Sequence, residues 1–275
     1  MNLQDPDERK AFWELPDRRT TGVLALAGAA FFIIFFTVIL PSDGRTAALL
    51  LDRKSPHFPY PFTIQNIEHL LLFIGLGELF VRWRVAVRER SFVDSHLLPE
   101  DEQTVLELQD LGPIRRRVSK LFDGQNGLLP SLIDLCILQF QSGRSIDQTV
   151  AVLDSSLELI EHRVDLRYGL IRYIAWLIPT MGFIGTVIGL GASLASVPSS
   201  GDISLFDVAH KLALGFDCTM VALAESALIT FLLQVVNEME ETSVNLAGTY
   251  TLRNLINRLY EGEPRGRTAT HVAQR

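Results

Sequence analysis

The chain of 275 residues contains very few cysteines and no excess of basic side chains. Its two cysteines, Cys136 and Cys218, cannot make a disulfide framework, and no CxxC or Cys/His cluster offers a metal site. The 25 lysines and arginines are outnumbered by 32 acidic residues, and a net charge of −7 argues against a nucleic-acid-binding protein. The sequence also lacks internal repeats, low-complexity segments and a glycine-rich phosphate-binding loop.

Apolar residues are abundant and unevenly placed. They make up 48% of the chain, against 21% charged residues. The mean hydropathy of +0.22 is too high for an ordinary soluble domain of this size. Two long runs carry no charge, Thr20–Ser42 and Tyr173–Gly201. About 20 apolar residues suffice to cross a bilayer, so both runs are predicted to be transmembrane helices. The first is too long for the apolar core of a secretion signal, and we expect it to be retained.

Two weaker candidates contain charged residues. The segment 63–83 carries Glu68, His69 and Glu78, of which Glu68 and His69 need protein neighbours or water inside a membrane. Its alternative interpretation is a buried or interfacial helix. The segment 205–236 is apolar but carries Lys211, Asp217 and Glu225. Because 198–204 is short and rich in turn-forming residues, the third and fourth candidates are expected to form an antiparallel hairpin.

Basic residues predict the topology. Four arginines fall within nine residues at 82–90, and Arg167 and Arg172 precede the third candidate helix. Positive residues stay in the cytoplasm, which places both chain ends there. The sequence therefore predicts an all-α, polytopic membrane protein with four transmembrane helices. The predicted segments are a cytoplasmic N-terminus at 1–19, helix 20–42, periplasmic loop 43–62, helix 63–83, cytoplasmic helical region 84–170, helix 171–197, periplasmic turn 198–204, helix 205–236, and a cytoplasmic extension and tail at 237–275.

The cytoplasmic region is predicted to be helical. A helix start is expected at Pro99, which precedes three acids that favour a helix N-terminus. The apolar segment 127–143 is interpreted as a core helix, with a re-entrant segment as the alternative, and 123–127 is interpreted as a break. Apolar spacing indicates another helix from Ile146. The last helix has no breaker before Gly248 and should project from the membrane, because 205–241 would be about 55 Å long. The tail after Tyr260 is expected to be disordered.

Small and hydroxyl residues follow one face of the third candidate helix. Gly182, Gly185 and Gly189 lie at spacings of three and four residues with Thr186 among them, so another backbone can approach closely. Plain helix packing is one interpretation, and a face that lines an axial space is the other. In the second, Thr186 would present its hydroxyl to a permeating ion.

The fourth candidate helix contains acids at two depths. Asp217 lies about 18 Å from its outer end and Thr186 about 16 Å from the corresponding end of its own helix, so both belong to one layer. Thr219 lies in the same layer on another face. A buried carboxylate must face a partner or water or be protonated, although a structural bond to a neighbouring hydroxyl is the alternative. Glu225 is expected about 30 Å in, as a surface acid at the cytoplasmic edge.

Two segments closely resemble the MotA/TolQ/ExbB proton channel family. They are Pro179–Leu190, which reads PTMGFIGTVIGL, and Leu212–Leu223, which reads LALGFDCTMVAL. The small-loop hairpin and the long final helix fit the same family, and four spans resemble the MotA layout more than the three-span TolQ/ExbB layout. The resemblance is specific over about 170–240. The chain departs from it in lacking the proline common in the last family span, where Glu225 and Ser226 stand instead.

The resemblance implies a homopentamer around two copies of a single-span partner of the ExbD/TolR/MotB type. In the family the ion-carrying aspartate belongs to that partner, and threonines of the third and fourth spans face it. Thr186 matches the first threonine, and the second falls at Asp217 or Thr219 depending on the register. The resemblance also implies a location in the bacterial inner membrane. The implied function is a stator-type channel subunit, without a cofactor, that couples the proton motive force to mechanical work. Sodium is the alternative ion, and the driven process is left open.

Two other classes of function compete with this interpretation. An enzyme is disfavoured because the segment 191–195 lacks the second glycine of a nucleophile elbow. The third and fourth candidate helices also offer no histidine apart from His210, near the outer end. A non-conducting membrane scaffold or sensor of the same fold is the stronger rival, because it needs only the packing of these helices.

Overall fold

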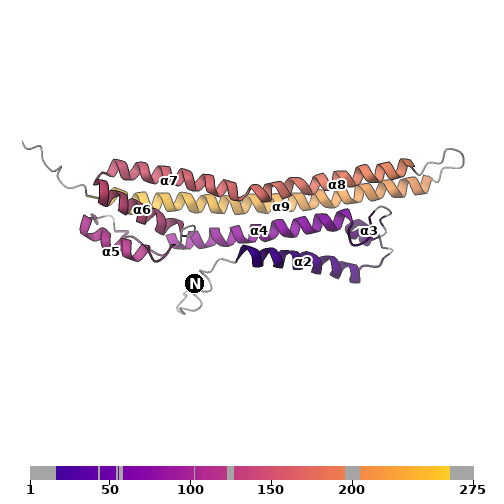
Figure 1. Cartoon of the computed structure of the whole chain (residues 1–275), viewed down its shortest axis with the longest axis horizontal. Coiled ribbons are helices and arrows are strands. Elements are labelled where there is room, and N and C mark those ends of the chain that lie inside the picture. The colour runs from indigo at the N-terminus through magenta and orange to yellow at the C-terminus, as the bar shows by residue number, and fades with distance from the viewer. Residues whose placement is uncertain are drawn as a thin grey trace, which may run out of the picture. The chain divides into compact units, whose positions relative to one another are not determined.

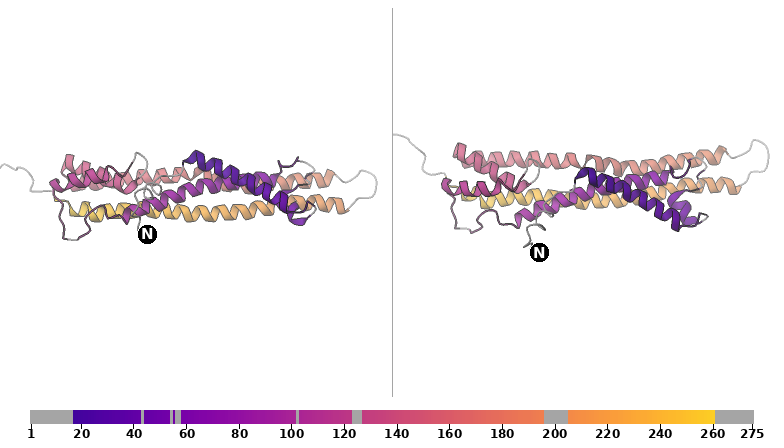
Figure 2. Two further views of the ribbon diagram at one scale, coloured as in Figure 1. Left: turned by 90° about the horizontal axis from the view of Figure 1, so that it is seen from below. Right: turned by 60° about the horizontal axis from the view of Figure 1, so that its bottom comes forward.

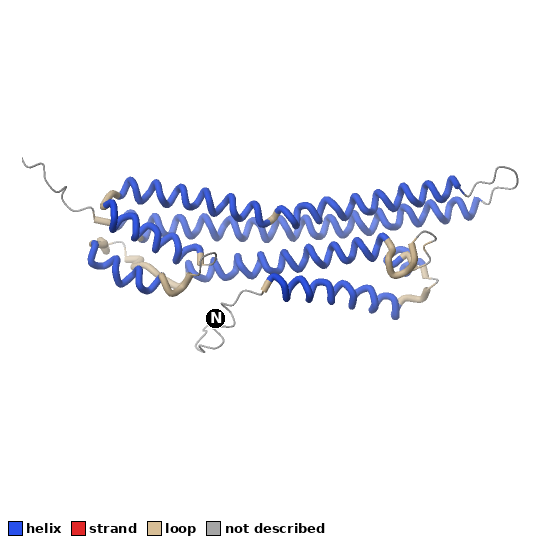
Figure 3. The backbone as a smooth tube through the Cα atoms, in the orientation of Figure 1, coloured by secondary structure: helices blue, strands red, loops and turns tan. Residues whose placement is uncertain are grey.

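The computed structural model describes residues 17–42, 44–53, 55, 58–101, 103–122, 127–195 and 205–260. Regular structure in these ranges is helical apart from one isolated bridge between Leu106 and Leu259, which confirms the all-α class (Figure 3). The turn predicted at 198–204, most of the break predicted at 123–127, the start of the predicted N-terminal segment and the predicted disordered tail lie outside the described residues.

Two compact units divide the chain, one formed by 1–85 with 165–240 and the other by 86–164 with 241–275. Three helices, α4, α7 and α9, contribute residues to both. The helices are α2 (Arg18–Ile39), α3 (Arg45–Leu51), α4 (Ile64–Val93), α5 (Leu108–Val118), α6 (Leu128–Gly143), α7 (Ile146–Arg167), α8 (Gly169–Ala195) and α9 (Leu205–Asn254), followed by the 3₁₀ turn η1 (Ile256–Arg258) (Figure 1).

In the first unit, α8 and α9 lie side by side and antiparallel (Figures 1 and 2). Hydrogen bonds join them at both ends of their contact. The Ser193 hydroxyl donates to the Val208 carbonyl at 3.0 Å, and the Ser226 hydroxyl donates to the Ala175 carbonyl at 3.0 Å. The predicted antiparallel pairing is therefore confirmed. Helix α9 also exceeds the predicted length, since it runs without interruption to Asn254.

Helix α4 packs against both members of this pair through a glycine. A side chain at Gly75 would collide with Ile229 of α9 and would come within 3.3 Å of Ile174 of α8. On another side of α4, a Cβ atom at Gly77 would lie 2.8 Å from that of Ala25 in α2. Glycines thus let α4 approach three other helices of this unit closely.

A short helix, α3, was not anticipated from the sequence, which indicated only a loop over 43–62. It is anchored by the Thr63 hydroxyl, which donates to the Leu51 carbonyl at 2.9 Å. Two of its own residues, Ala47 and Leu51, are fully buried. With seven residues, α3 is too short to show a clear apolar periodicity, so it could not be predicted from the sequence pattern.

Three segments of the described chain are long and apolar enough to cross a membrane: Arg18–Ile39, Ile146–Ala195 and Val208–Arg258. Their apolar stretches are mostly exposed, and α2 is the least covered of them. Extensive apolar surface of this kind needs lipid or a partner protein. Helix α4 is not among the three. Its first turns carry Gln65, Asn66, Glu68 and His69, and all four are buried by protein.

In the second unit, α6 is a buried core helix, as predicted for 127–143. Its N-terminus is capped by Glu89, whose carboxylate accepts bonds from the amides of Gly127 at 3.0 Å and Leu128 at 2.6 Å. A carboxylate is the group that the N-terminus of a helix favours. Cys136 is buried in the same helix, and burial raises the pKa of its thiol to about 12, so the thiol stays neutral.

The helix start predicted at Pro99 is wrong, because α5 begins only at Leu108. The first three residues of this stretch instead accept hydrogen bonds from the buried guanidinium of Arg258. That group donates to the carbonyls of Pro99 at 2.7 Å, Glu100 at 3.0 Å, and also Asp101. Three successive carbonyls turned to one side chain are incompatible with helical bonding. The interaction joins residues about 160 apart in sequence, so no local pattern could reveal it.

Candidate functional site

The predicted glycine face of α8 forms the closest contact with α9. A Cβ atom at Gly189 would lie 2.8 Å from the Cα of Gly215, and one at Gly182 would lie 2.5 Å from the Cβ of Ala222 and 3.0 Å from the Cα of Thr219. One at Gly185 would collide with the Cys218 sulfur. Every residue of this stripe therefore brings the two backbones together, as small residues do in membrane helix pairs.

Gly189 allows a direct test of this contact. Gly189→Ala would place a methyl group against the backbone of Gly215, and we expect a loss of about 1–3 kcal/mol of stability from overpacking. Gly191→Ala is the matched control, because nothing lies within 4 Å of its Cβ and alanine favours a helix. Thermal unfolding of the solubilised protein measures both. Equal melting temperatures for the two variants would contradict the close contact.

Two hydroxyls meet in the middle of this contact. Thr186 of α8 and Thr219 of α9 are joined by a hydrogen bond between their Oγ1 atoms. Each hydroxyl also reaches a backbone carbonyl of the opposite helix, Thr186 that of Gly215 at 3.0 Å and Thr219 that of Gly182 at 2.8 Å. Both residues are half-buried, so the hydroxyls are neither sealed in the core nor fully open.

Asp217 does not join the hydroxyl pair. It is buried, and one of its oxygens accepts a bond of 2.7 Å from the Arg45 guanidinium of α3. Two residues along a helix turn the side chain by about 200°, so Asp217 and Thr219 face nearly opposite sides of α9. A buried carboxylate requires a partner, and that of Asp217 is a base of α3, the short helix between α2 and α4.

Glu225 is not the surface acid that the sequence suggested. It is buried, and its carboxyl is hydrogen-bonded to Nδ1 of His69 in α4. The ring of Phe32 in α2 packs edge-on against the His69 ring, with centroids 5.0 Å apart. The expectation failed because it used depth along α9 alone, whereas α4 covers the face of α9 that carries Glu225. That His69 and Glu68 need protein neighbours was correct, since both are buried.

Two functional pairings were therefore missed, Arg45 with Asp217 and His69 with Glu225. Their members are separated by 172 and 156 residues. The only signal in the sequence was an excess of unpaired acids in apolar segments, which demands compensating groups without identifying them.

Comparison with known protein families identifies the segment that holds the hydroxyl pair. Residues 125–246 match the MotA/TolQ/ExbB proton channel family. The resemblance read from Pro179–Leu190 and Leu212–Leu223 is thereby confirmed, since both motifs lie inside the match. The match covers less than half of the chain and leaves out α2, α3 and α4. No similar curated protein and no similar solved structure was found.

The match indicates the class of function only in broad terms. The family consists of proton channels rather than known enzymes, and its members form oligomeric complexes with partner subunits. Together with the three apolar segments, the match indicates a membrane protein with a channel or stator-type function.

Proposed function

We propose that this chain is a stator-type channel subunit of the bacterial inner membrane that couples the proton motive force to mechanical work. It acts with a single-span partner of the ExbD/TolR/MotB type, and five copies of it surround two copies of that partner. The observation that carries the proposal is the Thr186–Thr219 hydroxyl pair, because it lies in the family-matched segment where two apolar helices meet.

The proposed membrane arrangement keeps four spans with both ends cytoplasmic. Helix α4 supplies the second span over 63–83, although its first turns are polar. Its acids argue for a protein-facing position rather than a lipid-facing one: Glu68 is fully covered, and the half-buried Glu78 is bound by Arg18 at 2.8 Å. The arginines at 82–90 support a cytoplasmic position for the end of this helix.

Within the site, we assign the ion-facing role to Thr186 and Thr219 and a supporting role to Asp217. Thr219 is favoured over Asp217 as the second family threonine, because it contacts Thr186 whereas Asp217 binds Arg45 on the other side of α9. The partner's aspartate would carry the ion, and half-buried hydroxyls beside it would receive the ion as it leaves. The glycines at 182, 185 and 189 hold the two hydroxyl-bearing helices at this distance.

Proton uptake by liposomes tests the proposal. The chain is reconstituted alone, or with the single-span protein that copurifies with it, and an inside-negative potential drives uptake. Each 100 mV supplies roughly 2.3 kcal/mol per elementary charge, which favours inward movement. We expect uptake above background only when both proteins are present. Background uptake in both preparations would instead support the scaffold alternative, which the hydroxyls' bonds to backbone carbonyls also favour.

A further inference from the structure

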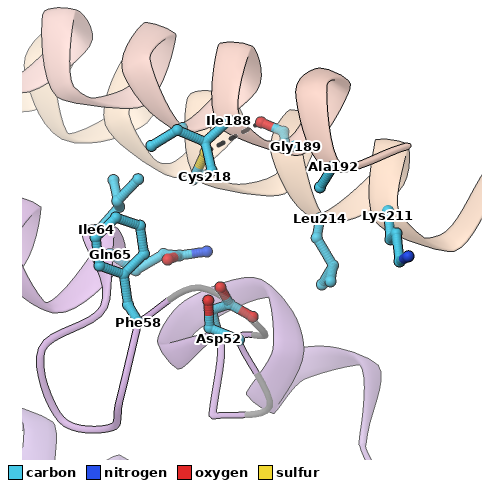
Figure 4. A pocket seen from close by; sticks show the side chains of 13 residues that line it. Asp52, Phe58, Ile64, Gln65, Ile188, Gly189, Ala192, Lys211, Leu214 and Cys218 are labelled. Carbon is cyan, nitrogen blue, oxygen red and sulfur yellow. Dashed lines mark hydrogen bonds between the residues drawn. The ribbon is translucent and has the colours of Figure 1, made fainter. Parts of the chain in front are cut away.

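A small cavity extends from the loop after α3 into the helices of the first unit (Figure 4). Its walls come from α8, α9 and the first turn of α4, and its volume is about 30 Å³, which suffices for one or two water molecules. Gln65 of α4 lies at this cavity and is 1% exposed. Neither its amide oxygen nor its amide nitrogen has a partner among the described residues, so the cavity offers an unsatisfied polar wall.

Glu68 lies one helical turn beyond Gln65. It is 0% exposed, and both its carboxyl oxygens are without a hydrogen-bond partner in the described part of the chain. On the same face of α4, Ile64 approaches Gly185 of α8 and Gly75 meets Ile229 of α9. Spacings of four and seven residues place Glu68 between these contacts, so its carboxyl belongs to the groove between α8 and α9.

The neighbouring His69–Glu225 pair holds a proton of its own. His69 Nε2 lies 2.9 Å from the Leu50 carbonyl, which can only accept, so Nε2 must carry a hydrogen. The other ring nitrogen, Nδ1, is bonded to the Glu225 carboxyl. That bond requires a proton between the two groups, on either the ring or the carboxyl. The pair is therefore neutral overall and cannot balance a second negative charge.

Few other groups around Glu68 could balance a negative charge on its carboxyl. In α8, Arg172 is the sole residue with a formal charge at neutral pH, and it is exposed; in α2, the charged residues are Arg18 and Arg19 at the N-terminal end. From α9, Asp217 is bound by Arg45 and Cys218 is a thiol. Lys211 and the acid Asp52 also line the cavity, and Figure 4 draws Lys211 at the end away from Gln65. An ionised carboxylate buried without a partner is costly, so it takes up a proton instead.

We propose that Glu68 and the adjacent His69–Glu225 pair form a second proton-binding site, inside the subunit, that receives protons through water in the cavity at Gln65. Glu68 and His69 lie on α4, outside the family-matched segment, whereas Glu225 lies on α9 within it. The site is distinct from the Thr186–Thr219 pair. Glu68 holds one exchangeable proton in addition to the one shared by His69 and Glu225. This inference requires no single-span partner and no net proton flux.

Infrared difference spectroscopy of the full chain in lipid tests the site without any transport measurement. At neutral pH we expect the carbonyl band of a protonated carboxyl group, which shifts in D₂O. Glu68→Gln should remove one such band per subunit. Glu78→Gln is the matched control in the same helix and should leave the band in place, because Glu78 is ion-paired with Arg18.

Further measurements show whether Glu68 binds a proton or another cation, and whether the variant protein still folds. Gln replaces a neutral carboxyl with a neutral amide of the same shape, so Glu68→Gln should melt within a few degrees of the unaltered protein. An ionised Glu68 at neutral pH overturns the proposal, as does a band that appears only when Na⁺ is removed. A band that survives Glu68→Gln and disappears in Glu225→Gln would also overturn it, because the extra proton would then belong to Glu225.

Discussion

Thr186→Val is expected to lower proton uptake about tenfold or more in liposomes that contain the complete complex, which corresponds to a barrier higher by about 1.4 kcal/mol. Valine keeps the shape of threonine but removes the hydroxyl that bonds Thr219 and reaches the Gly215 carbonyl. Thr219→Val should have a similar effect, because either change leaves one hydroxyl of the pair alone.

The readout distinguishes conduction from helix packing. Interhelical hydrogen bonds in membranes contribute only about 0.6 kcal/mol on average, so the melting temperature should change little. Thr180→Val is a control in the same helix, since among the described residues that hydroxyl bonds its own helix alone, at the Trp176 carbonyl 2.9 Å away. Normal uptake in both site variants would remove Thr186 and Thr219 from the ion route. A matching loss in Thr180→Val would mean that the effect is not specific to the pair.

Arg45→Ala is expected to destabilise the protein, although Arg45 itself lies at the surface. Its guanidinium is two-thirds exposed, but the Asp217 carboxylate that it binds is only 5% exposed. Removing one partner of a buried pair costs roughly 3–5 kcal/mol, and solvent access on the arginine side reduces our expectation to about 2 kcal/mol. For a chain of this size the melting temperature should fall by roughly 4–8 °C.

A double variant shows whether the cost comes from the unpaired charge. Arg45→Ala with Asp217→Asn leaves no ionised group at the site, so much of the lost stability should return. Arg19→Ala, an exposed arginine of α2, is the control and should be neutral within about 0.5 kcal/mol. If the double variant is as unstable as the sum of the two single variants, Arg45 and Asp217 do not stabilise one another.

The sequence predicted those features of the fold that depend on nearby residues. The helical class, the core helix at 127–143, the helix from Ile146 and the antiparallel pairing of α8 and α9 all follow from apolar spacing or from a short connection. The glycine contacts also followed, because small residues on one helix face invite a second backbone. The four-span arrangement and its orientation remain proposals.

The partners of the charged residues could not be predicted. Glu225 was placed at the membrane edge because its depth along α9 was known but the helix covering it was not. Asp217 was grouped with Thr186 by depth, whereas its direction around α9 turns it toward Arg45. The supposed helix at Pro99 was prevented by Arg258, about 160 residues away. In each case a group distant in sequence decided the outcome.

The two buried acids of α9 bear on how the chain enters the bilayer. Both receive their compensating base from the first third of the chain, Asp217 from Arg45 and Glu225 from His69. Synthesis proceeds from the N-terminus, so each base is made well before the acid that it neutralises. The order of translation thus allows α9 to be inserted beside Arg45 and His69, which have already been synthesised. A fragment that begins after α4 would lack both bases and would have to place both acids in lipid without them.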